Sequence, residues 1–520
     1  MTKTFRQSIS WLHTWSGLIL GWICFAIFFT GTYSYFKNEI TYWMKPEAHT
    51  VRTENLDTAE LAEAALRYLE NNAPDVAEWS ISLPDSRMPV LQAGYRERLP
   101  KDLKQEDYVR SHVPMTVVDP ETGEGIKTRD TDGGNFLYRF HIELYGMDRK
   151  IGREIVGIAT MLMFVALISG VIIHRRIFSD FFTFRRGKGA RSWIDIHAFT
   201  GVLTLPYLAM IIYSGLVLLM ISVLPWNAKI VSQAFDKHIN DHMKAEQVDA
   251  PEVKQALTDI KPLIKDAEKR LNAKIGSITV SNPYADNMLI VMMASRGNDV
   301  IGGFKGTGVA GRAVYKGTNG RFMGLMNMTP SNPFGKTSGV LSSFHLARFA
   351  DTFTRWLFFV SGTLGTVMIG TGLIIWTSKK SGNTKKSFGR KLVEILNVGA
   401  IAGLTAAVAV HLWANRLLPE DMPMRADWEI RIFFIAWLLF AVYPLVRPVE
   451  KAWMEEFSIG AVLFLLLPVL NGFTSQVNFF SFDPIITGFD FVAVGIGALL
   501  GYGAWRMRRF DNKNYVKEEA

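Results

Sequence analysis

The chain has 520 residues, of which 49% are hydrophobic, 12% aromatic and only 20% charged. A soluble protein of this length carries more charge, and here the apolar residues form blocks of about 18 or more, long enough to cross hydrocarbon. The net charge of +9 is concentrated beside these blocks, at residues 174–191 and 377–391. Such clusters indicate cytoplasmic loops of a membrane protein and argue against a nucleic-acid-binding surface.

The single cysteine, Cys24, lies inside the first apolar block. Intrachain disulfides, iron–sulfur clusters and structural zinc–thiolate sites are therefore excluded, so redox chemistry has to depend on histidine or on a bound cofactor. The first block, about residues 9–36, is too long for the core of a signal peptide and lacks a convincing cleavage site. We expect it to remain as a membrane anchor.

Eight apolar segments are predicted to cross the membrane as helices. They lie near residues 9–36, 153–174, 197–222, 354–377, 393–417, 429–447, 455–471 and 489–507. Lys3 and Arg6 place the N-terminus in the cytoplasm, and the basic loops and tail place the C-terminus there too. The predicted divisions are a span at 1–36, an extracytoplasmic domain at 37–152, spans with a basic loop at 153–222, a second extracytoplasmic domain at 223–353, a span at 354–377, a basic loop at 378–392, four further spans at 393–507 and a cytoplasmic tail at 508–520.

Each long polar segment has the pattern of a small α+β domain. In the first, residues 55–74 read as an amphipathic helix capped by Asp57 or Thr58, and residues 115–126 as two strands joined by a turn. In the second, residues 253–271 read as a helix and residues 277–295 as a β-hairpin.

The first two-thirds of the chain is an internal repeat of span, helix–hairpin domain and span. Three pairs of short sequences support it, in the same order: "LHTWSGL" with "IHAFTGV", "FHIELYG" with "FHLARFA", and "SGVIIHRR" with "TGLIIWTS". The last four spans lack this pattern and are expected to form a separate, appended bundle. The predicted fold is thus an all-α polytopic membrane protein with a four-helix core and two small α+β domains.

Six of the ten histidines are associated with spans, where ionisable groups are usually functional. The other four, His49, His112, His238 and His242, are expected to be solvated surface residues. "HINDH" at 238–242 pairs two imidazoles at i and i+4, which is a weak metal signal without a third ligand.

The repeat places His13 and His197 at equivalent positions near the cytoplasmic face, with His174 at the same face. It places His141 and His345 at equivalent positions near the outer face. In a four-helix bundle each equivalent pair faces the central axis, an arrangement that holds a haem iron by both axial positions. His13 and the outer end of the first span are about 22 residues apart, or roughly 33 Å, so one haem cannot serve both faces.

Gly17 and Gly201 each follow an inner histidine by one helical turn, where a flat macrocycle can approach the backbone. Helix packing is the alternative reading of these glycines. Arg139, Arg348 and Arg355 beside the outer pair, and Arg6, Trp15 and Trp193 beside the inner pair, are candidate partners for haem propionates or interfacial anchors.

Two other uses of the inner histidines remain open. His13, His174 and His197 are enough nitrogens for zinc, although zinc does not explain the outer pair. A proton relay needs a polar file between the faces, and the span interiors are nearly all apolar. The counterpart of His174 is Trp376, so the repeat does not require it as a ligand. We expect His411, outside the repeat, to be structural or interfacial.

"LHTWSGLILG", "SGVIIHRRIF", "WIDIHAFTGVLTLP" and "FHLARF" resemble the PepSY-associated transmembrane proteins, and "VVDPETGEG" resembles their extracytoplasmic PepSY domains. The resemblance covers about residues 1–380. It implies an iron-regulated protein of the bacterial inner membrane, similar to a dihaem ferric-siderophore reductase. It implies two b-type haems held by His13, His197, His141 and His345, with His174 as an alternative inner ligand and Gly17, Gly201 and Arg348 beside them.

The expected function is therefore an electron conduit that reduces periplasmic Fe(III)–siderophore or another ferric chelate. The donor is a cytoplasmic reductant or a quinol, because no Gly-rich loop has the strand–turn–helix context of a flavin or nicotinamide site. "GGFKGTGVAGR" at 302–312 reads as an extracytoplasmic loop near the chelate. The alternatives are a siderophore or iron permease without haem, which predicts broken helices and a polar cavity, and a regulator that senses metal through its PepSY domains.

Overall fold

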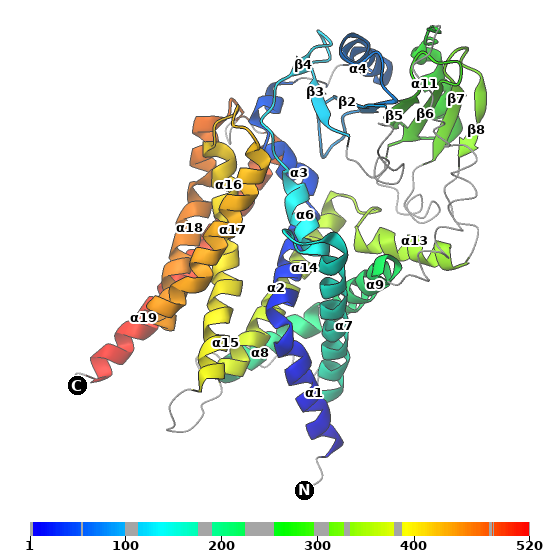
Figure 1. Ribbon diagram of the computed structural model, residues 1–520. Helices are drawn as coiled ribbons and strands as arrows, with labels where there is room; N and C mark the ends of the chain where they lie inside the picture. Colours follow the sequence, from blue (N-terminus) through cyan, green and yellow to red (C-terminus); the bar gives the residue numbers. More distant parts are fainter. Residues whose placement is uncertain are drawn as a thin grey trace. The chain divides into compact units, whose positions relative to one another are not determined.

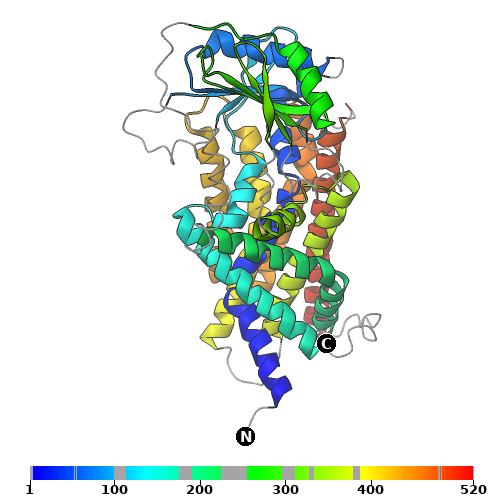
Figure 2. The same ribbon diagram turned by 90° about the vertical axis from the view of Figure 1, so that its right-hand side faces the viewer.

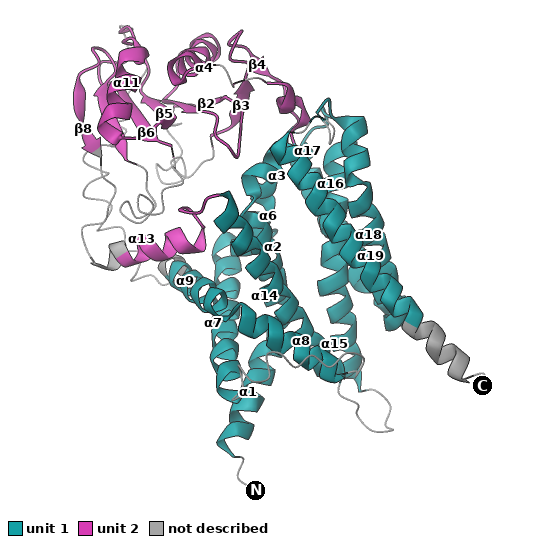
Figure 3. Cartoon of the chain, turned by 180° about the vertical axis from the view of Figure 1, so that it is seen from behind, with its two compact units in different colours: residues 1–44, 130–224, 352–520 teal, residues 45–129, 225–351 magenta. Residues whose placement is uncertain are grey.

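The computed structural model describes residues 4–51, 53, 56–98, 113–174, 190–223, 254–295, 311–326, 333–378, 387–477, 481 and 483–518. The chain divides into two compact units (Figure 3). Unit 1 holds residues 1–44, 130–224 and 352–520, and unit 2 holds residues 45–129 and 225–351. His112, "HINDH", most of both basic loops and most of "GGFKGTGVAGR" lie outside the described residues.

Unit 2 is built on one eight-stranded antiparallel sheet. Its strands are β1 (Glu78–Ser82), β2 (Gln92–Arg96), β3 (Met115–Val118), β4 (Gly125–Ile126), β5 (Ile275–Ser281), β6 (Leu289–Ala294), β7 (Arg312–Lys316) and β8 (Phe322–Met326), in the spatial order β4-β3-β2-β1-β5-β6-β7-β8. Helices α4 (Thr58–Asn72) and α11 (Ile260–Leu271) cover one face of the sheet (Figure 1, Figure 2). The 3-10 helix η1 (Pro46–Thr50) and α13 (Pro333–His345) also belong to this unit.

The two polar segments of the sequence meet at the centre of this sheet. β1 pairs with β5 in antiparallel register from Glu78 opposite Ser281 to Ser82 opposite Ser277. One hydrophobic core runs beneath α4 and α11 and includes Trp79 and Ile278 from the two central strands. Where the sequence pattern suggested two separate domains, the segments share one sheet and one core, because each first strand would otherwise be an exposed edge.

The predicted elements of unit 2 are largely confirmed. The first helix is capped by Asp57, which accepts hydrogen bonds from the backbone N–H groups of Ala59 and Glu60, both at 2.8 Å. The bond from Glu60 holds the pKa of Asp57 below its usual value. This cap therefore stabilises the helix above the ordinary pH of Asp titration, about 4, and loses that contribution as the pH falls below it. Both predicted hairpins form, whereas the second helix begins at Ile260 and not at residue 253.

Unit 1 is helical. Its elements are α1 (Phe5–Ile19), α2 (Gly21–Ser34), α3 (Lys37–Trp43), α6 (Gly134–Glu143), α7 (Arg149–Ile173), α8 (Ala190–Leu203), α9 (Leu205–Val223), α14 (Thr352–Ser378), α15 (Phe388–Val398), the π-helical turn η2 (Gly399–Gly403), α16 (Leu404–Leu417), α17 (Arg425–Val446), α18 (Val449–Thr474) and α19 (Pro484–Glu518). Within the described residues, six helices are long and apolar enough to cross a membrane, or eight spans if each of two bent helix pairs counts as one. The chain is a multi-pass membrane protein.

The two bent pairs are the first and third predicted spans. The chain bends by 65° between α1 and α2 and by 71° between α8 and α9. The breaks fall at Leu20 and Thr204, each seven residues after an inner histidine. Pro206 lacks the N–H that would continue α8 into α9, which explains the second break. The first has no proline; a Cβ on Gly21 would come within 2.6 Å of Leu373, so close approach of α14 accompanies it.

The repeat is visible in how the core helices pack. Within each repeat the histidine-bearing helix contacts the following long helix, α1 against α7 and α8 against α14. Between repeats the contacts are exchanged, α2 against α14 and α9 against α7. Cys24, Ala159 and Leu208 from three of these helices lie in one buried cluster. The two repeats therefore interlock as a four-span core.

The last four spans are not a separate bundle, as we expected from their sequence, but part of unit 1. α15 packs against α14, and α19 against α3. A buried polar cluster reinforces this contact. Arg416 donates to the carbonyl of Trp43 at 2.6 Å and to Asn471 at 3.0 Å, and Asp490 accepts from Asn471 and from the Trp43 indole, both at 3.2 Å.

We predict that Trp79→Ala destabilises unit 2 by about 3–5 kcal/mol, because its fully buried ring packs against Tyr284 of the second segment. Hydrogen exchange of the full-length protein should show faster exchange in β2 and β6 together. Ser82→Ala, at a half-buried position on the same strand, is the control. Loss of protection in the first segment alone would contradict the shared core.

Candidate functional site

The structure brings the two inner histidines together. The ring centroids of His13 on α1 and His197 on α8 are 6.3 Å apart, with an angle of 71° between the ring planes. Both rings are partly buried within unit 1. The repeat predicted that these two histidines lie close together. The contacts of each ring explain how the ring is held in place.

Each inner ring is fixed by a backbone carbonyl of a neighbouring helix. Nδ1 of His13 lies 2.8 Å from the carbonyl oxygen of Ala166 on α7, and Nδ1 of His197 lies 2.7 Å from that of Met368 on α14. A carbonyl only accepts, so Nδ1 of each ring carries the proton and donates it. Nε2 is then the nitrogen with a lone pair, and it has no hydrogen-bond partner among the described residues. This is the tautomer that binds a metal.

A glycine makes room for each of these rings. A Cβ at Gly170 would lie 3.0 Å from Cε1 of His13, and one at Gly372 would lie 3.1 Å from Cε1 of His197. Each glycine follows the accepting carbonyl by four residues. Side chains in a helix tilt toward its N-terminus, so a side chain at that position would cover the carbonyl. Glycine leaves it accessible to a side chain from another helix.

A hydroxyl precedes each glycine. Ser169 Oγ lies 3.3 Å from Nδ1 of His13, and Thr371 Oγ1 lies 3.4 Å from Nδ1 of His197. The Ser-Gly and Thr-Gly pairs begin the matching sequences "SGVIIHRR" and "TGLIIWTS". The sequence alignment of the repeats contained this signal, but only the tertiary structure shows that these pairs hold the histidines.

His141 on α6 is held in the same way. Its Nδ1 donates to the carbonyl of Ile27 on α2 at 2.8 Å, and a Cβ at Gly31 would lie only 2.6 Å from that nitrogen. Gly31 again follows the accepting carbonyl by four residues, and Thr30 precedes it with a hydroxyl. Three histidines of unit 1 therefore share one arrangement, in which Nδ1 donates to a backbone carbonyl and a glycine follows that carbonyl by four residues.

The remaining predicted residues are placed as follows. His174 caps the C-terminal end of α7. His345 ends α13 in unit 2. Nothing described lies within 4 Å of a Cβ built on Gly17, whereas one on Gly201 would meet Met368 Sδ at 3.1 Å. Gly17 therefore faces open space. Gly201 packs against α14, the helix whose Met368 carbonyl accepts the hydrogen bond from His197.

Two of the candidate arginines have carboxylate partners. Arg139 pairs with Glu143 at 3.0 Å, and Arg355 pairs with Glu39 at 3.8 Å. Arg348 is half-buried in unit 2. At the inner end, Arg6 and Trp15 are exposed, and Trp193 is half-buried on α8.

The three-nitrogen zinc site considered above is not supported. Among the described ranges, no group of three or more His, Cys, Asp or Glu side chains is arranged to hold a metal ion.

Two expectations about polar residues are wrong. His49, expected at the surface, is buried in unit 2. The spans are less apolar than expected, since Glu429, Glu456 and Asp490 are fully buried in α17, α18 and α19. Glu429 is compensated by Arg425, Asn415 and Thr131, whereas Glu456 has no hydrogen-bond partner among the described residues. Their single charges interrupt long apolar runs, so hydropathy alone concealed them.

His411 is fully buried in α16 and not interfacial. Its Nδ1 lies 3.2 Å from the carbonyl of Glu429, and its ring packs against Phe136 at a centroid distance of 4.9 Å. The contact with Phe136 on α6 supports the structural role we expected.

Comparison with protein families gives one match. The model described as the PepSY-associated TM region matches residues 10–379, more than two-thirds of the chain. A comparison with curated proteins finds no match.

We predict that Gly372→Val destabilises the protein by about 1–3 kcal/mol, because its side chain would collide with the His197 ring. Thermal unfolding of the full-length protein measures the effect. Gly157→Val on α7, where a Cβ has open space, is the matched control. Equal stability of the two variants would contradict the tight contact between Gly372 and His197.

Proposed function

Because the chain belongs to the PepSY-associated transmembrane family, we propose that it is an inner-membrane electron conduit with two b-type haems. Its substrate is a ferric chelate, such as Fe(III)–siderophore, in the periplasm. The observation that carries the proposal is the pair of inner imidazoles, 6.3 Å apart between ring centroids and each held by Nδ1.

The residues present fit a bis-imidazole haem. Two imidazoles that bind one metal from opposite sides, with metal–nitrogen bonds of about 2 Å, have ring centres roughly 6 Å apart. Hydrogen bonds from Nδ1 leave Nε2 of His13 and His197 for the metal. The open space beside Gly17, one turn from His13, agrees with a flat macrocycle lying there. Helix packing, the alternative reading, explains Gly201 better.

His141 and His345 are the proposed outer ligands. His141 has the same carbonyl, hydroxyl and glycine arrangement as the inner pair. Shifting Ile27, Thr30 and Gly31 by the 184 residues that separate His13 from His197 gives Ile211, Ser214 and Gly215. Ser214 bonds back to the carbonyls of Met210 and Ile211, as Thr30 does to Ala26 and Ile27. The sequence repeat thus gives Ile211, Ser214 and Gly215 as the second-repeat equivalents of Ile27, Thr30 and Gly31.

When bound, each haem takes up and gives up one electron, which links a donor at one membrane face to ferric iron at the other. The chain's part is to fix the imidazole orientation through Nδ1 and to keep the rings partly buried away from water. Arg348 is proposed to neutralise a propionate. Hard oxygen ligands hold Fe(III) better than Fe(II), so one-electron reduction of the chelate loosens the metal.

The proposal includes the predicted topology. Both termini lie in the cytoplasm, and unit 2 lies in the periplasm, the side on which the ferric chelate is reduced. Positive residues in the two basic loops support this orientation.

A permease is the second candidate, because both repeats contain a broken span and Glu456 is buried without a described partner. Against it, most other buried charges of the last four spans bond to one another and to the core. A haem-free preparation from haem-replete cells would favour the permease or a metal-sensing regulator.

We predict that the purified protein contains two b-type haems per chain, and that His13→Ala and His141→Ala each lower this to about one. A reduced-minus-oxidised spectrum with pyridine-haemochrome quantification measures the number. His411→Ala, which removes a buried histidine outside the repeat, should retain two. No haem in the wild-type protein would overturn the reductase proposal.

Substitution of two kinds of glycine distinguishes an effect on helix packing from an effect on haem binding. Gly17 faces open space, whereas Gly31 and Gly215 are proposed to position the outer ligands. Gly17→Val should lower haem content without lowering the stability of the haem-free protein, because its side chain enters open space. Gly31→Val and Gly215→Val should each reduce haem content by disturbing an outer ligand. If Gly215→Val keeps both haems while Gly31→Val loses one, Gly215 does not act as the counterpart of Gly31.

A further inference from the structure

We propose that a pocket in unit 1 binds a membrane quinol, which serves as the electron donor to the His13–His197 site. This inference rests on the proposed function and assigns a role to the last four spans. The pocket lies between α2 and α14 of the core on one side and α15, α16, α18 and α19 on the other.

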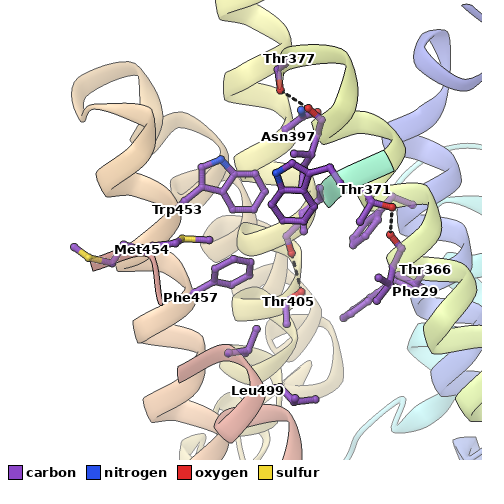
Figure 4. A pocket seen from close by; sticks show the side chains of 18 of the residues that line it. Phe29, Thr366, Thr371, Thr377, Asn397, Thr405, Trp453, Met454, Phe457 and Leu499 are labelled. Carbon is purple, nitrogen blue, oxygen red and sulfur yellow. Dashed lines mark hydrogen bonds between the residues drawn. The ribbon is translucent and has the colours of Figure 1, made fainter. Parts of the chain in front are cut away.

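The pocket has the size and the walls of a small-molecule site. Its volume is about 730 Å³, within the usual range of roughly 300–1,000 Å³. Figure 4 shows Phe29, Thr366 and Thr371 facing Trp453, Met454 and Phe457 across the cavity. Aromatic and sulfur-bearing side chains pack well against a flat, polarisable ring.

Both polar and apolar side chains line the pocket. Thr377 and Asn397 lie together in Figure 4, and Ser378, Glu394 and Lys451 also line the pocket. Leu499 and Ile496 on α19 are among its apolar lining residues. A quinol combines the same two kinds of group, with two hydroxyl groups on its ring and a long apolar tail.

The pocket shares structural elements with the inner histidines. Thr371 lines the pocket, and its Oγ1 lies 3.4 Å from Nδ1 of His197. Trp193 also lines it and lies four residues before His197 on α8, hence on the same face of that helix. A ring bound beside Thr371 is therefore separated from the histidine by a single layer of side chains.

The rim gives access from the lipid phase. Val367 and Leu499 line the pocket and are 40% and 73% exposed. Both lie on helices that are long and apolar enough to span a membrane. A donor dissolved in the bilayer can enter there without crossing the polar surface. The sequence contains no nucleotide-binding loop in the required context, so a membrane-soluble donor also explains how the chain is reduced.

The reaction balances with groups named above. Oxidation of the quinol to the quinone breaks two O–H bonds and releases two electrons and two protons. Haem iron held by His13 and His197 would supply a one-electron acceptor, so the two electrons would leave the quinol one at a time. The Glu394 carboxylate, which lines the pocket and accepts a hydrogen bond from Arg390 at 3.2 Å, would take up the first proton and release it to bulk water before it takes up the second.

Photolabelling with an azido-ubiquinone tests the proposal without measuring turnover. The full-length haem-loaded protein is irradiated with the probe, and the labelled peptides are identified by mass spectrometry. We expect labels on α18 near residues 453–457 or on α16 near Thr405, and their loss in excess decylubiquinone. Labelling elsewhere, or displacement by phospholipid as readily as by quinone, overturns the proposal.

Variants locate the probe in the pocket. Thr405→Phe fills the cavity and should reduce labelling at least tenfold, whereas Val462→Phe, on the exposed face of α18 outside the pocket, should not. If Thr405→Phe does not fold, Leu499→Trp narrows the rim at an exposed position. Unchanged labelling in the folded variants also overturns the proposal. Two haems without specific labelling would reject the quinol site alone, whereas specific labelling without haem would reject the proposed reductase and retain the pocket.

Discussion

An imidazole binds a metal well when its second nitrogen is fixed, and in this protein backbone carbonyls of neighbouring helices fix it. Ala166, Met368 and Ile27 each accept a hydrogen bond from the Nδ1–H of a histidine on another helix. Each of these carbonyls lies within an α-helix, where the helix's own hydrogen bonds use one lone pair. The oxygen has a second lone pair, which can accept the bond from the histidine. Glycine four residues later removes the side chain that would cover it. The position of the core helices depends on this close approach.

The same arrangement explains the order of the repeat. Each repeat contributes a histidine on one helix and a hydroxyl–glycine pair on another. Displacement of either helix would break the hydrogen bond between the histidine and the backbone carbonyl. The exchange of contacts between α2 and α14 and between α9 and α7 interlocks the two copies. In unit 2 the copies also meet symmetrically, because β1 and β5 pair as the two central strands. Duplication therefore acts through helix packing in one unit and through strand pairing in the other.

The last four spans complete this core in two ways. Polar clusters around Arg416 and Glu429 tie them to α3 and to the segment before α6. Their helices also form the far wall of the cavity beside Thr371. A buried charge needs a partner within reach, so these clusters restrict how the spans sit against the core.

Much of this protein was determined by its sequence alone. Length and hydropathy predicted the spans, since crossing hydrocarbon requires about 20 apolar residues in a helix. The three matching sequences predicted the repeat and paired His13 with His197, because equivalent positions in duplicated helices face one axis. Capping by Asp57 and both hairpins followed from local hydrogen-bonding patterns.

Only the tertiary structure decided which partners these residues have. The acceptors of the histidines are backbone carbonyls 114 to 171 residues away along the chain. Every residue has a backbone carbonyl, so no residue type marks these acceptors in the sequence. The bend at Leu20 has no proline to mark it in the sequence. The two predicted domains join into one sheet through backbone hydrogen bonds between edge strands, and such bonds do not depend on particular side chains. Hydropathy does not reveal that Glu429 and Asp490 are buried, because each has partners on other elements, such as Asn415 for Glu429 and Asn471 for Asp490. Local chemistry can be read along the chain, whereas contacts between distant segments require the fold.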